Sequence, residues 1–207
     1  MNIVVLASGE GTTLQAVLDA CAAGRLPARV GAVISNNGAA GALRRARDAG
    51  VPTRQVSAAT AGGAAAADQV LCDTLREFDP ELVLLAGYMK RLGRLTLAAF
   101  AGRIINVHPA LLPEFGGQGM FGMHVHRAVL AAGRRTSGAT VHWVDENYDT
   151  GAVVAQVRVP VESQDSAESL AARVQAAERE LVIEVLAAAA SGRLTPPRKL
   201  SERSVTS

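Results

Sequence analysis

The sequence predicts an α/β protein with a Rossmann-like, open and mostly parallel sheet that is flanked by helices. Up to about residue 107, short apolar runs alternate with stretches of helical periodicity, which is typical of right-handed βαβ units. After that point the pattern changes to two strand-like runs joined by a turn-rich segment, and a long helical stretch follows. We therefore expect an antiparallel C-terminal strand addition and a long C-terminal helix.

The first half of the chain supplies the parallel strands. Its opening residues form an uninterrupted apolar run, as in a strand that is buried on both faces of a sheet. Later runs end in turn residues such as Asn36-Asn37-Gly38, and the segments between them repeat their apolar residues at helical spacing. The expected strands are residues 2–7, 30–35, 51–56, 82–86 and 103–107, and the expected helices are residues 14–23, 40–49 and 62–78.

The second half begins with a long glycine-rich loop and ends in a segment rich in proline, serine and charged residues. The turn-rich residues 145–151 separate the two strand-like runs, which favours an antiparallel pair. We expect a loop at 109–123, a short helix at 124–132, strands at 137–144 and 152–159, a long helix at 167–190 and a disordered tail at 195–207.

Composition limits the partners and the compartment. A chain of 207 residues fits one domain, and its net charge of +2 gives no support to a nucleic-acid or anionic-membrane partner. No apolar run approaches the length of a membrane span, and the start of the chain predicts a strand, not a signal peptide. Cys21 and Cys72 lack CxxC spacing, so they are interpreted as buried thiols of a cytoplasmic protein.

Asn106 and His108 mark the expected site. They end an apolar strand, and ligands of α/β proteins gather at the carboxyl ends of strands. Side chains two residues apart in a strand point to the same side, and Pro109 helps to end the strand there. An amide can donate to a developing oxyanion, and an imidazole can carry a proton near neutral pH. Chemistry is therefore expected at this strand end.

The loop after the first strand is a candidate phosphate site. Gly9-x-Gly11 leads directly into a helix, where backbone N–H groups and the helix dipole favour an anion. The dinucleotide fingerprint fails because Leu14 replaces its third glycine and Asn36 replaces its acid, and the Walker lysine is absent. Two interpretations stay open: a phosphate monoester held by Gly11, Thr12 and Thr13, or a tight turn in which a threonine caps the helix.

The other polar residues each allow a purely structural interpretation. His124, His126 and His142 have no HExxH or cysteine partner that would support a metal site, so they are most simply structural. Asp149 lies in a turn, where aspartate is favoured for local hydrogen bonds. Alternatively, its loop folds back over His108, where the carboxylate would raise the pKa of the imidazole. Three charged residues, taken alone, are interpreted as solvated side chains: Lys90, Arg91 and Glu178.

Residues 106–113, Asn-Val-His-Pro-Ala-Leu-Leu-Pro, resemble the N-x-H-P-(S/A)-L-L-P signature of the folate-dependent formyltransferases. Residues 8–13, 86–89 and 149–151 extend the resemblance, which runs from Met1 to about Leu194. It implies an enzyme that takes a formyl group from 10-formyltetrahydrofolate. The loop at 8–13 favours the members in purine biosynthesis, which formylate the amine of N1-(5-phosphoribosyl)glycinamide and release tetrahydrofolate.

The resemblance also implies roles for individual residues. Asn106, His108 and Asp149 would take the catalytic positions. The acceptor would be bound by Gly11, Thr12, Thr13 and Glu178, and the folate by Met89, Lys90, Arg91, Leu92 and Asn106 with the loop at 145–149. It further implies a single domain at 1–194, with a phosphate-binding half (1–100) and a catalytic and folate-binding half (101–194), working without a metal as a monomer or homodimer.

Three departures from the family pattern concern the folate side. Ala64 stands where the family usually has an arginine that contacts the folate's glutamate tail, and Lys90 replaces a more usual arginine. Phe115-Gly116-Gly117 replaces aromatic-Pro-Gly, which leaves this loop freer before binding. The alternatives are another folate-dependent formyltransferase, a formyltetrahydrofolate hydrolase, or a non-catalytic folate- or nucleotide-binding module. Methionyl-tRNA formyltransferase and the hydrolase typically carry an extra domain for which 207 residues leave no room, and a sugar-nucleotide formyltransferase would not predict the phosphate loop at 8–13.

Overall fold

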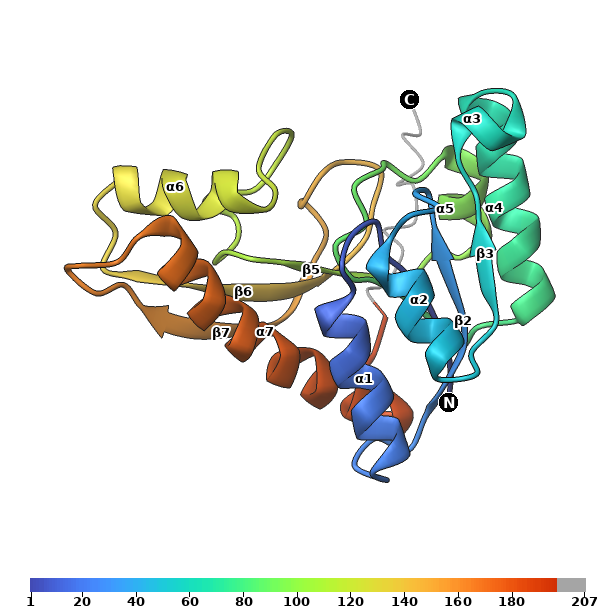
Figure 1. The fold of residues 1–207 in the computed structure, drawn as a ribbon, viewed down its shortest axis with the longest axis horizontal. Coiled ribbons are helices and arrows are strands. Elements are labelled where there is room, and N and C mark those ends of the chain that lie inside the picture. The colour runs from blue at the N-terminus through green and yellow to red at the C-terminus, as the bar shows by residue number, and fades with distance from the viewer. Residues whose placement is uncertain (197–207) are drawn as a thin grey trace, which may run out of the picture.

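The computed structural model describes residues 1–196 and contains one seven-stranded sheet with the order β3-β2-β1-β4-β5-β6-β7 (Figure 1). The first five strands run parallel, and β6 and β7 are added antiparallel to the β5 edge. The strands are β1 (Asn2–Leu6), β2 (Arg29–Ser35), β3 (Thr53–Gln55), β4 (Leu82–Leu85), β5 (Ile104–His108), β6 (Thr136–Trp143) and β7 (Val153–Pro160). The predicted fold class is confirmed.

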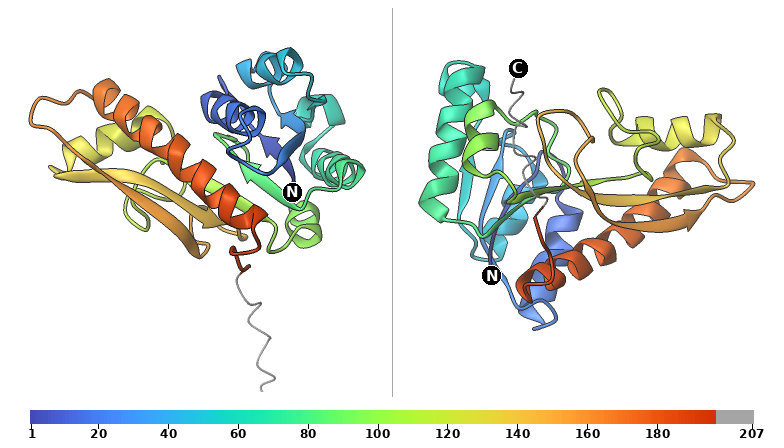
Figure 2. Two further views of the ribbon diagram at one scale, coloured as in Figure 1. Left: turned by 90° about the horizontal axis from the view of Figure 1, so that it is seen from below. Right: turned by 180° about the vertical axis from the view of Figure 1, so that it is seen from behind.

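Helices cover both faces of this sheet, as Figures 1 and 2 show. Ile3 and Val5 of β1 point into a core with α1, α2, α6 and α7, whereas Val4 and Leu6 point into a second core with α4 and α5. This alternation buries β1 on both sides, as its apolar run predicts. The helices are α1 (Thr12–Ala22), α2 (Gly41–Asp48), α3 (Ala58–Ala61), α4 (Ala64–Phe78), α5 (Arg94–Ala99), α6 (Met123–Ala131) and α7 (Ala167–Ala190).

Two short helices, α3 and α5, were not predicted. The expected helix at 62–78 begins only at Ala64, because Gly62 and Gly63 adopt positive φ angles of 84° and 137° and separate α3 from α4. Asp68 of α4 caps α5 by accepting from the backbone N–H groups of Leu95 (2.9 Å) and Thr96 (3.1 Å). A cap that comes from another helix leaves no signal in the local sequence.

The long helix α7 has the predicted bounds, and the other predicted elements are present with ends shifted by up to two residues. Apart from Thr195 and Pro196, the tail expected at 195–207 lies outside the described residues. Within residues 1–196, no helix is both long enough and apolar enough to cross a membrane.

Candidate active site

A cleft of about 640 Å³ opens at the carboxyl end of the sheet. The strands β1, β4 and β5 end at its floor, the loop after β6 forms one wall, and α7 closes one side. Its lining includes the residues predicted for the site: Gly11, Thr12, Thr13, Met89, Lys90, Arg91, Leu92, Asn106, His108, Asp149 and Glu178. The fold therefore brings these separate segments to one cavity.

Strand pairing sets the floor of the cleft. In the β5–β6 register Asn106 lies opposite His142, and His108 lies opposite Thr140. The two pairs are two residues apart, so all four side chains lie on the same face of the sheet. The His108 side chain is almost completely buried. Thr140 holds the chain just beyond the strand: its hydroxyl donates to the Ala110 carbonyl (2.6 Å) and accepts from the Leu112 N–H (3.0 Å).

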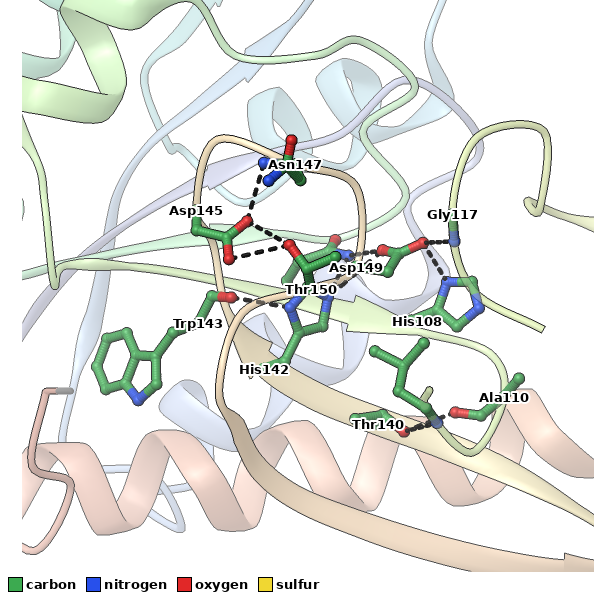
Figure 3. Close-up of polar contacts among 12 residues, drawn as sticks. His108, Ala110, Gly117, Thr140, His142, Trp143, Asp145, Asn147, Asp149 and Thr150 are labelled. Carbon is green, nitrogen blue, oxygen red and sulfur yellow. Dashed lines mark hydrogen bonds and ion pairs between the residues drawn. The ribbon is translucent and has the colours of Figure 1, made fainter. Parts of the chain in front are cut away.

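Asp149 reaches this floor from the loop between β6 and β7, as Figure 3 shows. Its Oδ2 accepts from the Gly117 N–H (2.9 Å) and lies 3.5 Å from Nδ1 of His108, and its Oδ1 lies 3.5 Å from Nε2 of His142. The backbone of Asp149 has a φ of 57°, a left-handed conformation that aspartate tolerates better than most residues. The loop does fold back over His108, as one of the two interpretations expected.

The carboxylate and the imidazole have shifted pKa values. Burial raises the pKa of Asp149, but its contact with His142, the charge of His108 and the Gly117 N–H outweigh this effect, so the net pKa is lowered. For His108 burial is the largest effect and lowers the pKa, although Asp149 and the Phe115 carbonyl oppose it. Asp149 does raise the pKa of His108, as its position over the ring implies, but burial of the ring has the larger effect and the net pKa is lowered.

The hydrogen bonds orient the side chains on the floor. Nε2 of His108 donates to the Phe115 carbonyl over 2.8 Å, since a carbonyl only accepts. For the same reason Nδ1 of His142 donates to the Trp143 carbonyl (2.8 Å), which leaves its Nε2 to accept from the Asn106 amide (3.0 Å). His108 meets Asp149 through Nδ1, so only the protonated ring donates to both of its neighbours.

At the other end of the cleft, the N-terminus of α1 points inward. The helix begins at Thr12 after Gly11, whose φ is 74°, and within the described residues no side chain caps it. The interpretation of a threonine cap is therefore wrong, and the first backbone N–H groups are left for a ligand. The Thr13 hydroxyl instead donates to Oε1 of Glu178 over 2.8 Å.

Glu178 is not the solvated charge that its helical context suggests. Its side chain is buried on α7 and lines the cleft. Burial raises its pKa, opposed by the Thr13 hydrogen bond and by Arg179. A buried acceptor beside the helix N-terminus suits a ligand with hydroxyl donors next to an anion.

The segment after β4 lines the cleft mouth. Met89 is exposed and Leu92 is buried, while Lys90 and Arg91 also line a second hollow of about 810 Å³. Ala64 belongs to that second hollow. Tyr88, which lines both cavities, is partly buried, and this burial raises its pKa to about 12.

Sequence reasoning did not assign two histidines to the site. His142 contacts Asn106 and Asp149 directly. His142 and Thr140 are two residues apart and lie opposite Asn106 and His108, and this matching spacing is the signal that could have placed His142 at the site. His126 is buried at the cleft, where burial and the charge of His108 lower its pKa. His124 stacks edge-to-face on Phe121 with a ring distance of 5.5 Å. Among residues 1–196, no group of three or more His, Cys, Asp or Glu side chains is arranged to hold a metal.

Comparison with known proteins identifies the family. Residues 1–186 match the family model described as formyl transferase. The chain is 40% identical over 194 residues to phosphoribosylglycinamide formyltransferase of Escherichia coli K12, covering 94% of this chain and 89% of the relative. It is 42% identical over 193 residues to the chloroplastic enzyme of that name from Vigna unguiculata, covering 93% of this chain but only 62% of the relative.

A solved structure agrees with these matches. The crystal structure of glycinamide ribonucleotide transformylase 1 from Symbiobacterium toebii superposes with a TM-score of 0.89 at 40% identity, covering 95% of this chain and 91% of that chain.

Proposed function

The chain belongs to the formyl transferase family, and from this premise we propose that its cleft formylates N1-(5-phosphoribosyl)glycinamide with 10-formyltetrahydrofolate. The products are the formylated ribonucleotide and tetrahydrofolate, and the reaction belongs to purine biosynthesis. One observation carries the proposal. The Asn106–His108–Asp149 cluster, in which His108 is buried, and the uncapped N-terminus of α1 open into the same cleft.

The acceptor binds at the α1 end. Its phosphate is held by the backbone N–H groups that follow Gly11, where the helix dipole adds to the attraction. The hydroxyl of Thr13 donates to Glu178 and not to the phosphate. Of the phosphate contact that the resemblance gave to Thr13, only its backbone N–H remains. Glu178 in turn receives the ribose hydroxyls, because its carboxylate is buried and can accept more than one hydrogen bond.

The folate binds across the cleft mouth. Met89 and Leu92 provide apolar contact for its ring system, and Lys90 and Arg91 provide charge for its acidic tail. The loop at 145–149 forms the opposing wall. This donor arrangement brings the formyl group to Asn106, between the two binding regions.

The reaction is attack of the acceptor amine on the formyl carbon. A C–N bond forms, the carbonyl electrons move to oxygen, and a tetrahedral intermediate results. Collapse of the intermediate breaks the bond between the formyl carbon and the folate nitrogen. The proton lost by the amine ends on that nitrogen, so the site must stabilise an oxyanion and carry one proton.

Asn106 and His108 stabilise the oxyanion. The Nε2–H of His108 now donates to the Phe115 carbonyl, and the oxyanion replaces this carbonyl as its acceptor. Asn106 donates one amide hydrogen to His142. Its amide nitrogen lies 3.5 Å from Oδ1 of Asp149, which is a long contact, so the second hydrogen is available to the oxyanion. A single donor of this kind contributes about 10²–10³-fold to the rate.

Asp149 is the proton carrier. Its pKa is lowered by His142, His108 and the Gly117 N–H, so the carboxylate is ionised at neutral pH. It stabilises positive charge on His108 as the oxyanion forms, which offsets the effect of burial on that ring. Through a water molecule it relays the amine proton to the folate nitrogen, a step that contributes about 10²–10⁴-fold.

The remaining parts of the proposal concern organisation and partners. The single domain spans residues 1–194, with the acceptor half at 1–100 and the catalytic and folate half at 101–194. Its partners are the two small-molecule substrates, with no nucleic acid, membrane or metal. It works in the cytoplasm as a monomer or homodimer.

The test is formyl transfer measured with both substrates and with each omitted. We expect transfer that depends on N1-(5-phosphoribosyl)glycinamide, and losses of at least about 100-fold in kcat for Asn106→Ala, His108→Ala and Asp149→Asn at unchanged melting temperature. Release of formate without an acceptor would identify a hydrolase, and binding without turnover would identify a binding module. Near-wild-type turnover of one variant would remove that residue from its role.

A further inference from the structure

The loop that carries Asp149 is folded upon itself. One carboxylate oxygen of Asp145 accepts from the Asn147 N–H (2.9 Å) and from the Thr150 hydroxyl (2.8 Å), as Figure 3 shows. These bonds join the two ends of the turn and fix its internal shape. They do not fix where the turn lies relative to the cleft, because all three residues belong to the same exposed loop.

Arg91 contacts this loop from the other side of the cleft. Its Nη2 donates to the Glu146 carbonyl, and its guanidinium carbon lies 5.8 Å from the centre of the Tyr148 ring. The two contacts are two residues apart on the loop and directly precede Asp149. Arg91 follows β4, so the contacts tie the parallel sheet to the loop between β6 and β7.

The same contacts separate the cleft from the second hollow. Arg91 and Glu146 line both cavities, so their hydrogen bond forms part of the wall between them. A planar guanidinium suits this position, because it can donate to a carbonyl while its face lies near an aromatic ring.

Asp149 has a reason to need such a restraint. Its φ of 57° is less favourable than an extended or right-handed conformation even for aspartate, so contacts outside this residue must keep the loop in place. The carboxylate is 3.5 Å from Nδ1 of His108, a distance at which a small shift breaks the contact.

From these contacts we infer that Arg91 is a positioning residue, which clasps Glu146 and Tyr148 and thereby holds Asp149 against His108. The inference rests on the catalytic role proposed for Asp149. It gives Arg91 a second task, in addition to the contact with the folate that the family resemblance implies for this position.

The experiment is a double-mutant cycle on the full chain with both substrates in excess. We expect Arg91→Leu to lower kcat about tenfold and to leave the KM of the phosphorylated acceptor within about twofold. Arg91→Lys, which can still donate to Glu146, should recover part of this loss, and Tyr148→Leu should reproduce part of it. In an Asp149→Asn background, Arg91→Leu should cost less than about twofold more, because both changes disable the same group.

Two further measurements isolate the clasp. Hydrogen exchange of peptides over residues 144–151 should accelerate in Arg91→Leu while the rest of the sheet is unchanged. Arg94→Leu is the matched control: Arg94 is an exposed arginine of the second hollow and does not line the cleft, so kcat and loop exchange should stay at wild-type values.

The outcomes separate the two proposals. If Arg91→Leu raises only the KM of the folate, or lowers kcat by the same factor in both backgrounds, Arg91 does not act through Asp149 and the clasp is overturned. If Asp149→Asn alone has near-wild-type kcat, the proposed catalytic role of Asp149 is wrong, and the inference about Arg91 that depends on it is wrong too. This failure of the proposed function is visible in the single variant, before the double mutant is measured.

Discussion

Asn106 and His142 face each other across β5 and β6 and share a hydrogen bond of 3.0 Å. Because Nδ1 of His142 donates to the Trp143 carbonyl, its Nε2 must accept from the amide. This bond decides which end of the Asn106 amide is nitrogen, and therefore that the side chain can donate toward a developing oxyanion. His142 is thus a partner of the catalytic amide and not only a strand residue.

The first prediction concerns this pair. His142→Phe removes the acceptor and frees the Asn106 amide to rotate, so kcat should fall at least about tenfold, part of the effect of losing a donor altogether. His142→Gln retains an acceptor oxygen and should restore most of the rate. Steady-state kinetics of both variants with the two substrates checks this. Equal losses in the two variants would show that the hydrogen bond does not orient Asn106.

The second prediction concerns the protonation of His108. Burial lowers its pKa, so an NMR titration should give a midpoint below the ordinary value of about 6.5. Asp149→Asn removes the opposing attraction, so the midpoint should fall further. Since the folded state disfavours the charged ring, this residue makes the protein less stable as the pH falls below about 6.5. A midpoint that rises in Asp149→Asn would contradict the attraction between the two side chains.

The fold was largely predictable because each main element carries a local signal. The apolar run of β1 and the periodicity of α7 are properties of contiguous residues, and both elements appear where they were expected. The helix α5 was not predictable, because its six residues depend on a cap from Asp68, which precedes it by more than twenty residues. Short elements of this kind are decided by tertiary contacts.

The site was predictable only in part. The strand end at Asn106 and His108 gives a local signal, whereas the position of Asp149 depends on a loop whose path the sequence leaves open. The direction of the pKa shift of His108 depends on how deeply the ring is buried, which is a property of the whole fold. Thr13 and Glu178 are 165 positions apart, so their hydrogen bond could not be predicted from the local sequence either.

The third prediction follows from that buried carboxylate. Burial raises the pKa of Glu178, so its ionised form destabilises the folded protein at neutral and alkaline pH. Glu178→Gln keeps an acceptor for Thr13 and removes the charge, so it should raise the melting temperature at pH 8 by about 2 °C or more. The gain should vanish below about pH 4, where the carboxyl is protonated in both states.

The same variant should bind the acceptor less well. The amide accepts ribose hydroxyls more weakly than a carboxylate, so the KM of the phosphorylated acceptor should rise about tenfold while the KM of the folate is unchanged. Thermal melts across pH and kinetics with each substrate varied give both readouts. A lower melting temperature at pH 8 would show that the charge of Glu178 is stabilised in the fold.

The last prediction concerns Gly11 at the start of α1. Its φ of 74° is unfavourable for L-residues, and an added Cβ would lie 2.7 Å from Cα of Ala42 in α2. Gly11→Ala should therefore destabilise the protein by about 2 kcal/mol or more and displace the helix N-terminus, which raises the KM of the phosphorylated acceptor. Gly9→Ala is the matched control for stability, because Gly9 has no positive φ and nothing within 4 Å of the new methyl group. Urea unfolding should place this control within about 0.5 kcal/mol of wild type, and equal losses in the two variants would contradict the clash with α2.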